Sequence, residues 1–178
     1  MAWVVLYVAH SLDGFIATPD GGVGWLDKYN APDGADKDSY GYIEFLRSVD
    51  CLVMGSRTYQ QVIDSRDWPY GTKPVYVFSR RELPKASESV VIFDRSIAAF
   101  KTEVAPLYNR IWLVGGGMLA QVFMENSLID EMILFVVPVA LGSGIRLFQE
   151  SAIGSDWKLL GHRSYANGMV ELRYERAL

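Results

Sequence analysis

The hydrophobic residues of this chain fall into two kinds of run, which alternate along most of its length. Short continuous apolar runs, such as residues 4–9 and 51–54, predict buried strands. Apolar residues spaced three and four positions apart, as in residues 118–125, predict helices packed on one side. Further strands are predicted over residues 74–78, 90–93, 111–114, 128–137, 157–164 and 169–176, and further helices over residues 38–49, 59–66 and 96–107.

This alternation predicts an α/β fold, in which a mostly parallel sheet has helices on both faces as a three-layer αβα sandwich. Asn167-Gly168 between the last two strands is a strong hairpin signal, so a C-terminal antiparallel hairpin is expected at one side of the sheet. Residues 11–38 form an unusually long loop, and its apolar residues Phe15 and Trp25 favour a binding loop or lid over disorder. We expect a single domain over residues 1–178.

The composition narrows the classes of function. The 178 residues are 50% hydrophobic with a net charge of -4, and without a basic run they give no reason to expect nucleic acid. The lone cysteine excludes an intramolecular disulfide and a cysteine-based metal cluster. The apolar run at residues 3–10 is too short to span a bilayer, so we expect a cytoplasmic protein with no membrane contact. We also expect no bound metal.

Three glycines, Gly115, Gly116 and Gly117, stand where a predicted strand changes into a predicted helix. Glycine allows close approach of the backbone, and the amides of the first helical turn then point beyond the strand end. Those amides favour an anion, so a phosphate group fits this position. A tight turn that binds no ligand is an equally consistent interpretation.

The ends of two other predicted strands also carry chemistry suited to anions. One is followed by a glycine, two hydroxyl residues and an arginine, and the next by serine and arginine. A guanidinium binds phosphate bidentately and stays charged, so together the three strand ends suit a dinucleotide with an extra phosphate. Taken singly, the hydroxyl residues are also ordinary helix caps and the arginines ordinary solvated side chains. The residues concerned are Gly55, Ser56, Arg57, Thr58, Ser79 and Arg80.

Five segments carry a family resemblance. They are Ser-Leu-Asp-Gly at 11–14, Val-Met-Gly-Ser-Arg-Thr-Tyr at 53–59, Val-Phe-Ser-Arg at 77–80, Leu-Val-Gly-Gly-Gly at 113–117, and Pro-Val-Ala-Leu-Gly-Ser-Gly-Ile-Arg-Leu-Phe at 138–148. In this order they resemble the dihydrofolate-reductase-like superfamily. The last segment is particularly similar to the reductase domain at the C-terminal end of the bifunctional riboflavin-biosynthesis deaminase-reductase.

The resemblance implies an NADPH-dependent reductase. The turns at 55–58 and 79–80 would hold the adenosine phosphate side, with Arg57 and Arg80 selecting NADPH over NADH. Gly115, Gly116 and Gly117 would hold the diphosphate, with Met118 and Leu119 of the helix after them. Ala9 and Ile16 would flank the nicotinamide amide.

The substrate side is less defined. Dihydrofolate reductases place a carboxylate on the first helix, where Asp38 is the nearest acid here and Glu44 lies further on; both also fit a helix-start charge or a solvated residue. Asp13 would lie close to the substrate, or would simply form a turn before a glycine. Trp25 would close the loop over the substrate, or would simply fill the interior of the loop as a hydrophobic side chain. Arg146 would reach a substrate phosphate or a neighbouring subunit.

The favoured reaction is reduction of a pyrimidine related to the 5-amino-6-(5-phosphoribosylamino)uracil intermediate of riboflavin synthesis. The chain has no zinc-ligand set for the deaminase half of that pathway protein. Two alternatives remain: a reductase of pterins or of other carbonyl or imine compounds, and a module that binds NADPH without chemistry. We also expect a homodimer, because the C-terminal hairpin could leave an apolar edge.

Overall fold

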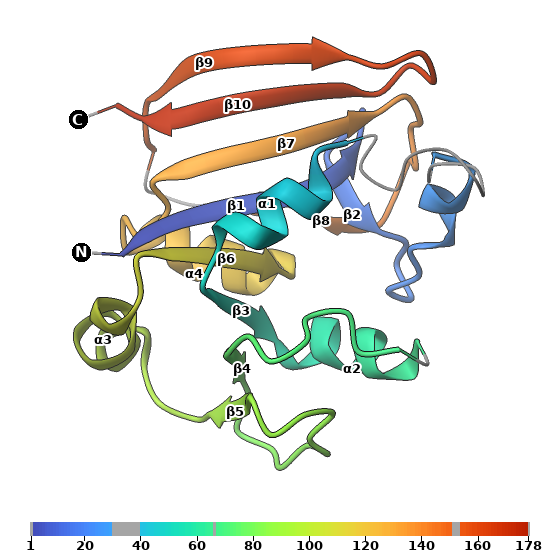
Figure 1. The fold of residues 1–178 in the computed structure, drawn as a ribbon. Coiled ribbons are helices and arrows are strands. Elements are labelled where there is room, and N and C mark those ends of the chain that lie inside the picture. Colours follow the sequence, from blue (N-terminus) through green and yellow to red (C-terminus); the bar gives the residue numbers. More distant parts are fainter. Residues whose placement is uncertain (1, 30–39, 66, 151–153, 178) are drawn as a thin grey trace.

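The fold is organised on one eight-stranded sheet (Figure 1). The computed structural model describes residues 2–29, 40–65, 67–150 and 154–177. Across the sheet the strands follow the order β5-β4-β3-β6-β1-β7-β10-β9. Their bounds are β1 (Trp3–Ser11), β3 (Cys51–Gly55), β4 (Val75–Phe78), β5 (Val90–Phe93), β6 (Arg110–Gly115), β7 (Glu131–Val137), β9 (Trp157–Ser164) and β10 (Val170–Arg176).

The sheet is parallel from β5 to β7 and antiparallel beyond it, as the sequence predicts. β1 lies between β6 and β7 and pairs in parallel with both. β10 runs antiparallel to β7 and to β9, and the two C-terminal strands form a hairpin. Gly168 in its turn has φ of 87°, a conformation that suits glycine. The carboxyl ends of β1, β3, β4 and β6 therefore meet at one edge of the sheet.

Helices cover both faces of the sheet, which confirms the predicted three-layer sandwich. In Figure 1, α1 crosses in front of the sheet and α4 lies behind it. Phe45 and Tyr59 belong to the hydrophobic core on the first face, and Phe100 and Phe123 to the core on the second. The helices of the first face are α1 (Tyr42–Ser48) and α2 (Ser56–Asp64), and those of the second are α3 (Ile97–Ala99), η2 (Phe100–Val104), η3 (Ala105–Leu107) and α4 (Gly117–Glu125).

Two predicted elements differ in the structure. The helix expected over residues 96–107 is a succession of one α-helical turn, a π turn and a 3-10 turn, and Pro106 lies near the start of the last of these. The strand expected over residues 128–137 begins only at Glu131. Before it, Asp130 accepts a hydrogen bond from the amide of Val4 (2.8 Å) and donates its own amide to the Val4 carbonyl (2.9 Å), which bends the chain into the sheet.

A second, two-stranded sheet lies where the sequence predicts only loops. β2 (Phe15–Ala17) follows β1 and pairs antiparallel with β8 (Ile145–Arg146), which follows β7. The long N-terminal loop also contains a 3-10 helix, η1 (Gly24–Tyr29). Among the described residues no helix is long and apolar enough to cross a membrane.

Candidate cofactor and substrate site

The ends of β3 and β6 meet at three glycines. A Cβ atom built on Gly55 would lie 3.8 Å from the carbonyl oxygen of Gly115 and 3.9 Å from the amide nitrogen of Gly116. A Cβ atom built on Gly116 would lie 3.3 Å from the hydroxyl oxygen of Thr58 and 3.9 Å from Cδ1 of Ile16. Side chains at these glycines would narrow the gap between the strand ends, so glycine leaves room for a ligand close to the backbone. The structure thus brings together the predicted segments 53–59 and 113–117, with Ile16 of the N-terminal loop beside them.

Two helices begin beside this glycine gap. α2 starts after Gly55 and α4 after Gly116, and neither capping glycine has a side chain to accept from the first amides. Neither first turn carries an acidic residue. Both N-terminal ends therefore offer partial positive charge and amide donors, an arrangement that suits the oxygens of a diphosphate.

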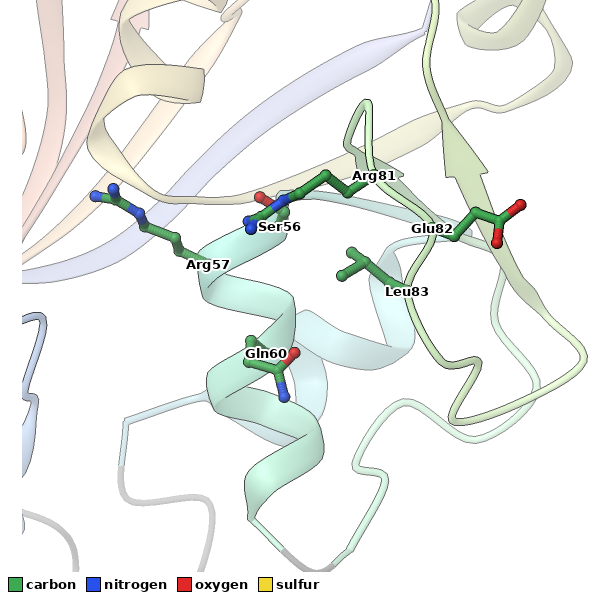
Figure 2. Close-up of a pocket in the computed structure, with 6 residues that line it drawn as sticks. All are labelled: Ser56, Arg57, Gln60, Arg81, Glu82 and Leu83. Atoms are coloured by element: carbon green, nitrogen blue, oxygen red, sulfur yellow. The ribbon is translucent and has the colours of Figure 1, made fainter.

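A pocket of about 270 Å³ opens next to the N-terminus of α2 (Figure 2). Arg57 belongs to the first turn of α2, while Arg81 comes from the loop after β4 and extends its side chain toward Ser56. Glu82 turns its carboxylate away from both guanidinium groups in the same view. Two cations and a hydroxyl at a helix N-terminus make this pocket suitable for a phosphate monoester. Its lining residues are Ser56, Arg57, Gln60, Arg81, Glu82 and Leu83.

Arg81, and not the predicted Arg80, lines this pocket. Ser79 is 9% exposed, and its hydroxyl accepts from the amide of Arg81 (3.0 Å) and donates to the Arg81 carbonyl (2.9 Å). These two hydrogen bonds fold the chain back after β4 and place Arg81 in the lining of the pocket beside α2, whereas both arginine side chains are exposed. The assignment of Ser79 and Arg80 to a cofactor stays a prediction, and Arg81 is added to it as a pocket arginine.

The first residue of α4 packs directly on the segment that contains β8. A Cβ atom on Gly117 would overlap the carbonyl oxygen of Arg146 and lie 3.6 Å from that of Leu147, so only glycine fits here. The side chain of Met118 is 72% exposed and free to contact a ligand. Leu119 is buried in the core, so it can reach a ligand only through its backbone amide.

Asp13 holds a loop in place at the end of β1. Its Oδ1 accepts from the Ser11 hydroxyl (2.6 Å) and the Leu141 amide (3.0 Å), and its Oδ2 accepts from the Gly142 amide (2.7 Å). The Ser11 hydroxyl and these two amides lower the pKa of Asp13 to about 2. The carboxylate is therefore ionised at neutral pH and orders this turn, while a role of Asp13 close to the substrate stays a prediction.

An aromatic cluster covers the sheet face next to Ala9. Tyr7 lies two residues earlier on β1 and on the same face, where its ring stacks on Phe45 at a centroid distance of 4.2 Å. Tyr42 and Trp112 meet edge to face, with centroids 5.9 Å apart. Burial raises the pKa of the Tyr7 and Tyr42 phenols, which remain protonated and able to donate.

The remaining substrate candidates are spread around this cluster. Trp25 in η1 packs against the same hydrophobic core, and its buried Nε1 has no hydrogen-bond partner among the described residues. Glu44 is exposed on α1, which fits the solvated interpretation. The guanidinium of Arg146 lies 4.8 Å from the ring centre of Phe15 and is solvent-exposed. Asp38 lies outside the described residues.

Sequence reasoning missed four lining residues of the pocket, Gln60, Arg81, Glu82 and Leu83. Gln60 lies one helical turn after Ser56, so the i, i+4 rule could have placed it on the same face. The doublet Arg80-Arg81 was visible, but the choice between its members depends on how the Ser79 hydroxyl turns the chain. Leu83 belongs to an irregular loop and carries no periodic signal.

These features define an α/β protein with a pocket and two helix N-termini at the carboxyl ends of a mostly parallel sheet. The chain matches the family described as the RibD C-terminal domain over residues 2–171, and it belongs to that family. The uncharacterized protein YwjB of Bacillus subtilis strain 168 is 36% identical over 175 residues, which cover 97% of both chains.

Solved structures agree with this assignment. A crystal structure from Shewanella sp. PV-4, of a protein assigned by name to riboflavin biosynthesis, is 31% identical, covers 100% of both chains and superposes with a TM-score of 0.88. A Thermotoga maritima protein, named as a deaminase and 5-amino-6-(5-phosphoribosylamino)uracil reductase, matches 99% of this chain and 57% of its own. Its TM-score is 0.72 at 14% identity, which shows the shared dihydrofolate-reductase-like fold. The family is one of NADPH-dependent reductases.

Proposed function

We propose that this protein is an NADPH-dependent reductase of a small heterocycle, most specifically a pyrimidine related to 5-amino-6-(5-phosphoribosylamino)uracil. The observation that carries the proposal is the convergence of two uncapped helix N-termini, a glycine gap and the Arg57–Arg81 pocket at one edge of the sheet. The family and the Shewanella relative support the reaction class.

The residues present fit such a cofactor. Arg57 and Arg81 would bind the extra phosphate on the adenosine side, and the Ser56 hydroxyl would add a donor there. Side chains at Gly55 and Gly116 would fill the space between the strand ends, so these glycines keep it open for the diphosphate beside the N-terminus of α4. The bound cofactor would supply a hydride.

The chain itself would orient the acceptor, exclude water and supply a proton. The face beside Ala9 is aromatic, which suits stacking of a planar ring. The phenol of Tyr42 is protonated at neutral pH, and burial raises its pKa further, so it can donate a hydrogen bond to a carbonyl or imine of that ring. Trp25 would limit the access of water from the loop side.

The test is consumption of NADPH, followed by its absorbance, with a panel of pyrimidines, pterins and simple carbonyl compounds. Turnover of the ribosylamino-pyrimidine supports the specific proposal. Turnover of pterins or carbonyls alone would move the protein to the alternative reductase class. Binding of NADPH with no turnover of any acceptor would favour the non-catalytic module, and failure to bind NADPH would reject the proposed function.

We further propose that two copies of the chain pair through its C-terminal edge. Leu159 and Leu160 of the edge strand β9 are 47% and 51% exposed, an unusual feature for an unprotected sheet edge. Light scattering after size-exclusion chromatography should give the mass of a dimer. A monomer mass at micromolar concentration would reject the pairing.

A further inference from the structure

The segment over residues 138–147 is tied to the N-terminal loop by backbone contacts at both of its ends. Near its start, the amide of Leu12 donates to the carbonyl of Val139 (2.8 Å). Near its end, the amide of Leu147 donates to the carbonyl of Gly14 (3.0 Å). The middle of the segment has a different attachment, because the amides of Leu141 and Gly142 both donate to the carboxylate of Asp13.

The carboxylate of Asp13 is itself fixed by the hydroxyl of Ser11. The buried hydroxyl of Ser11 donates to its Oδ1 and accepts from the amide of Phe15 (2.9 Å). The hydroxyl therefore connects the end of β1, the carboxylate and the start of β2 in one hydrogen-bonded unit. Each oxygen of Asp13 has a donor in a fixed direction, which limits the position of the 141–142 backbone.

The far end of the segment reaches the candidate cofactor site. β8 pairs with β2, and a Cβ atom on Gly144 would overlap the carbonyl oxygen of Ala17. The carbonyl of Arg146 packs against Gly117, the first residue of α4. A displacement of the 141–142 backbone would therefore be transmitted through β8 to the helix end that we assign to the diphosphate.

We propose that Asp13 is a positioning residue, whose carboxylate fixes segment 138–147 against the N-terminus of α4 and so shapes the diphosphate end of the cofactor site. This inference rests on the proposed function, because it assigns the residue a role in holding the cofactor. It differs from a role in substrate binding, since within the described part of the chain the carboxylate is hydrogen-bonded by the protein's own Ser11, Leu141 and Gly142.

Amide exchange followed by NMR tests the attachment without any cofactor. In Asp13→Asn, the side-chain oxygen can still accept from Ser11 and Leu141, whereas the nitrogen in place of Oδ2 cannot accept from Gly142. We expect the Gly142 amide to exchange about tenfold faster in this variant, and both the Gly142 and Leu141 amides to do so in Asp13→Ala. The matched control is Asp20→Asn, because Asp20 lies in the same loop and its carboxylate accepts from Thr18 and Gly22 of that loop. Unchanged exchange in both Asp13 variants would overturn the inference.

Cofactor titration tests the functional half. The dissociation constant of NADPH should rise about tenfold in Asp13→Ala and stay within about twofold in Asp20→Asn. With saturating NADPH, kcat should stay close to that of the wild type. A fall of kcat at unchanged KM for NADPH would make Asp13 a catalytic group and overturn the positioning role. An unchanged dissociation constant of NADPH would also overturn the positioning role. If the wild-type protein binds no NADPH, the proposed function itself fails, and the exchange result alone then reports on the attachment.

Discussion

The hydroxyl oxygen of Thr58 lies 3.3 Å from the position that a Cβ atom on Gly116 would occupy. Thr58 is in the first turn of α2, and Gly116 is the capping residue of α4, so the two helices begin within contact distance although they cover opposite faces of the sheet. This relationship brings two anion-binding helix ends to one point. It also shows how little room the site leaves for any side chain.

Replacement of Gly117 by alanine should destabilise the protein. The added Cβ would overlap the backbone carbonyl of Arg146, which cannot rotate away as a side chain could. We expect a loss of about 1–3 kcal/mol in the free energy of unfolding, measured by urea denaturation. Gly161→Ala is the control, since nothing lies within 4 Å of its Cβ position. Equal stability of the two variants would contradict the close contact.

The two pocket arginines should determine the choice between NADPH and NADH. Arg57→Ala and Arg81→Ala each remove a guanidinium from the lining of the pocket, and only NADPH carries the extra phosphate that needs it. We expect the dissociation constant of NADPH to rise about tenfold or more while that of NADH changes by less than about twofold. Arg80→Ala should leave both constants near those of the wild type, because this side chain does not line the pocket. Equal weakening of both cofactors would reject the phosphate assignment.

The hydrogen bonds of Asp13 should leave a signature in the acid stability of the protein. Its pKa is lowered from 3.8 to about 2 in the folded state, so its contribution is complete above the unfolded value and disappears as the pH falls through about 2. The difference in unfolding free energy between wild type and Asp13→Asn should therefore be largest above pH 4 and shrink steadily toward pH 2. Denaturation curves over this range measure it. A difference that grows on acidification has the wrong sign and would contradict the low pKa.

The phenol of Tyr42 should matter for turnover and not for cofactor binding. Tyr42→Phe retains the ring that packs edge-on against Trp112 but removes the hydroxyl. If this hydroxyl donates to the acceptor, kcat should fall about tenfold or more while the dissociation constant of NADPH stays unchanged. Tyr70→Phe is a matched control, because this buried tyrosine also packs edge-on against Trp112, with ring centroids 5.7 Å apart. Equal activities of the two variants would remove Tyr42 from the mechanism.

Much of the fold could be predicted because its strands are nearly continuous apolar runs. Buried strands such as β3 and β6 have few polar residues, so their ends, and hence the glycine gap at Gly55 and Gly116, could be located from the pattern. β2 and β8 could not be predicted, since they have only three and two residues and form only by pairing with one another. Which of Arg80 and Arg81 lines the pocket likewise depends on two hydrogen bonds of the Ser79 hydroxyl, and these cannot be inferred from the spacing of apolar residues.

The order of strands in the sheet has a consequence for how such a protein can diversify. The pocket that we assign to the phosphate monoester lies on the loops after β3 and β4, near one edge, whereas the aromatic face beside Ala9 borders β7, toward the hairpin. We therefore expect changes in α1 or in the C-terminal strands to alter the accepted compound without changing the preference for NADPH. Libraries restricted to one half should accordingly alter one property at a time.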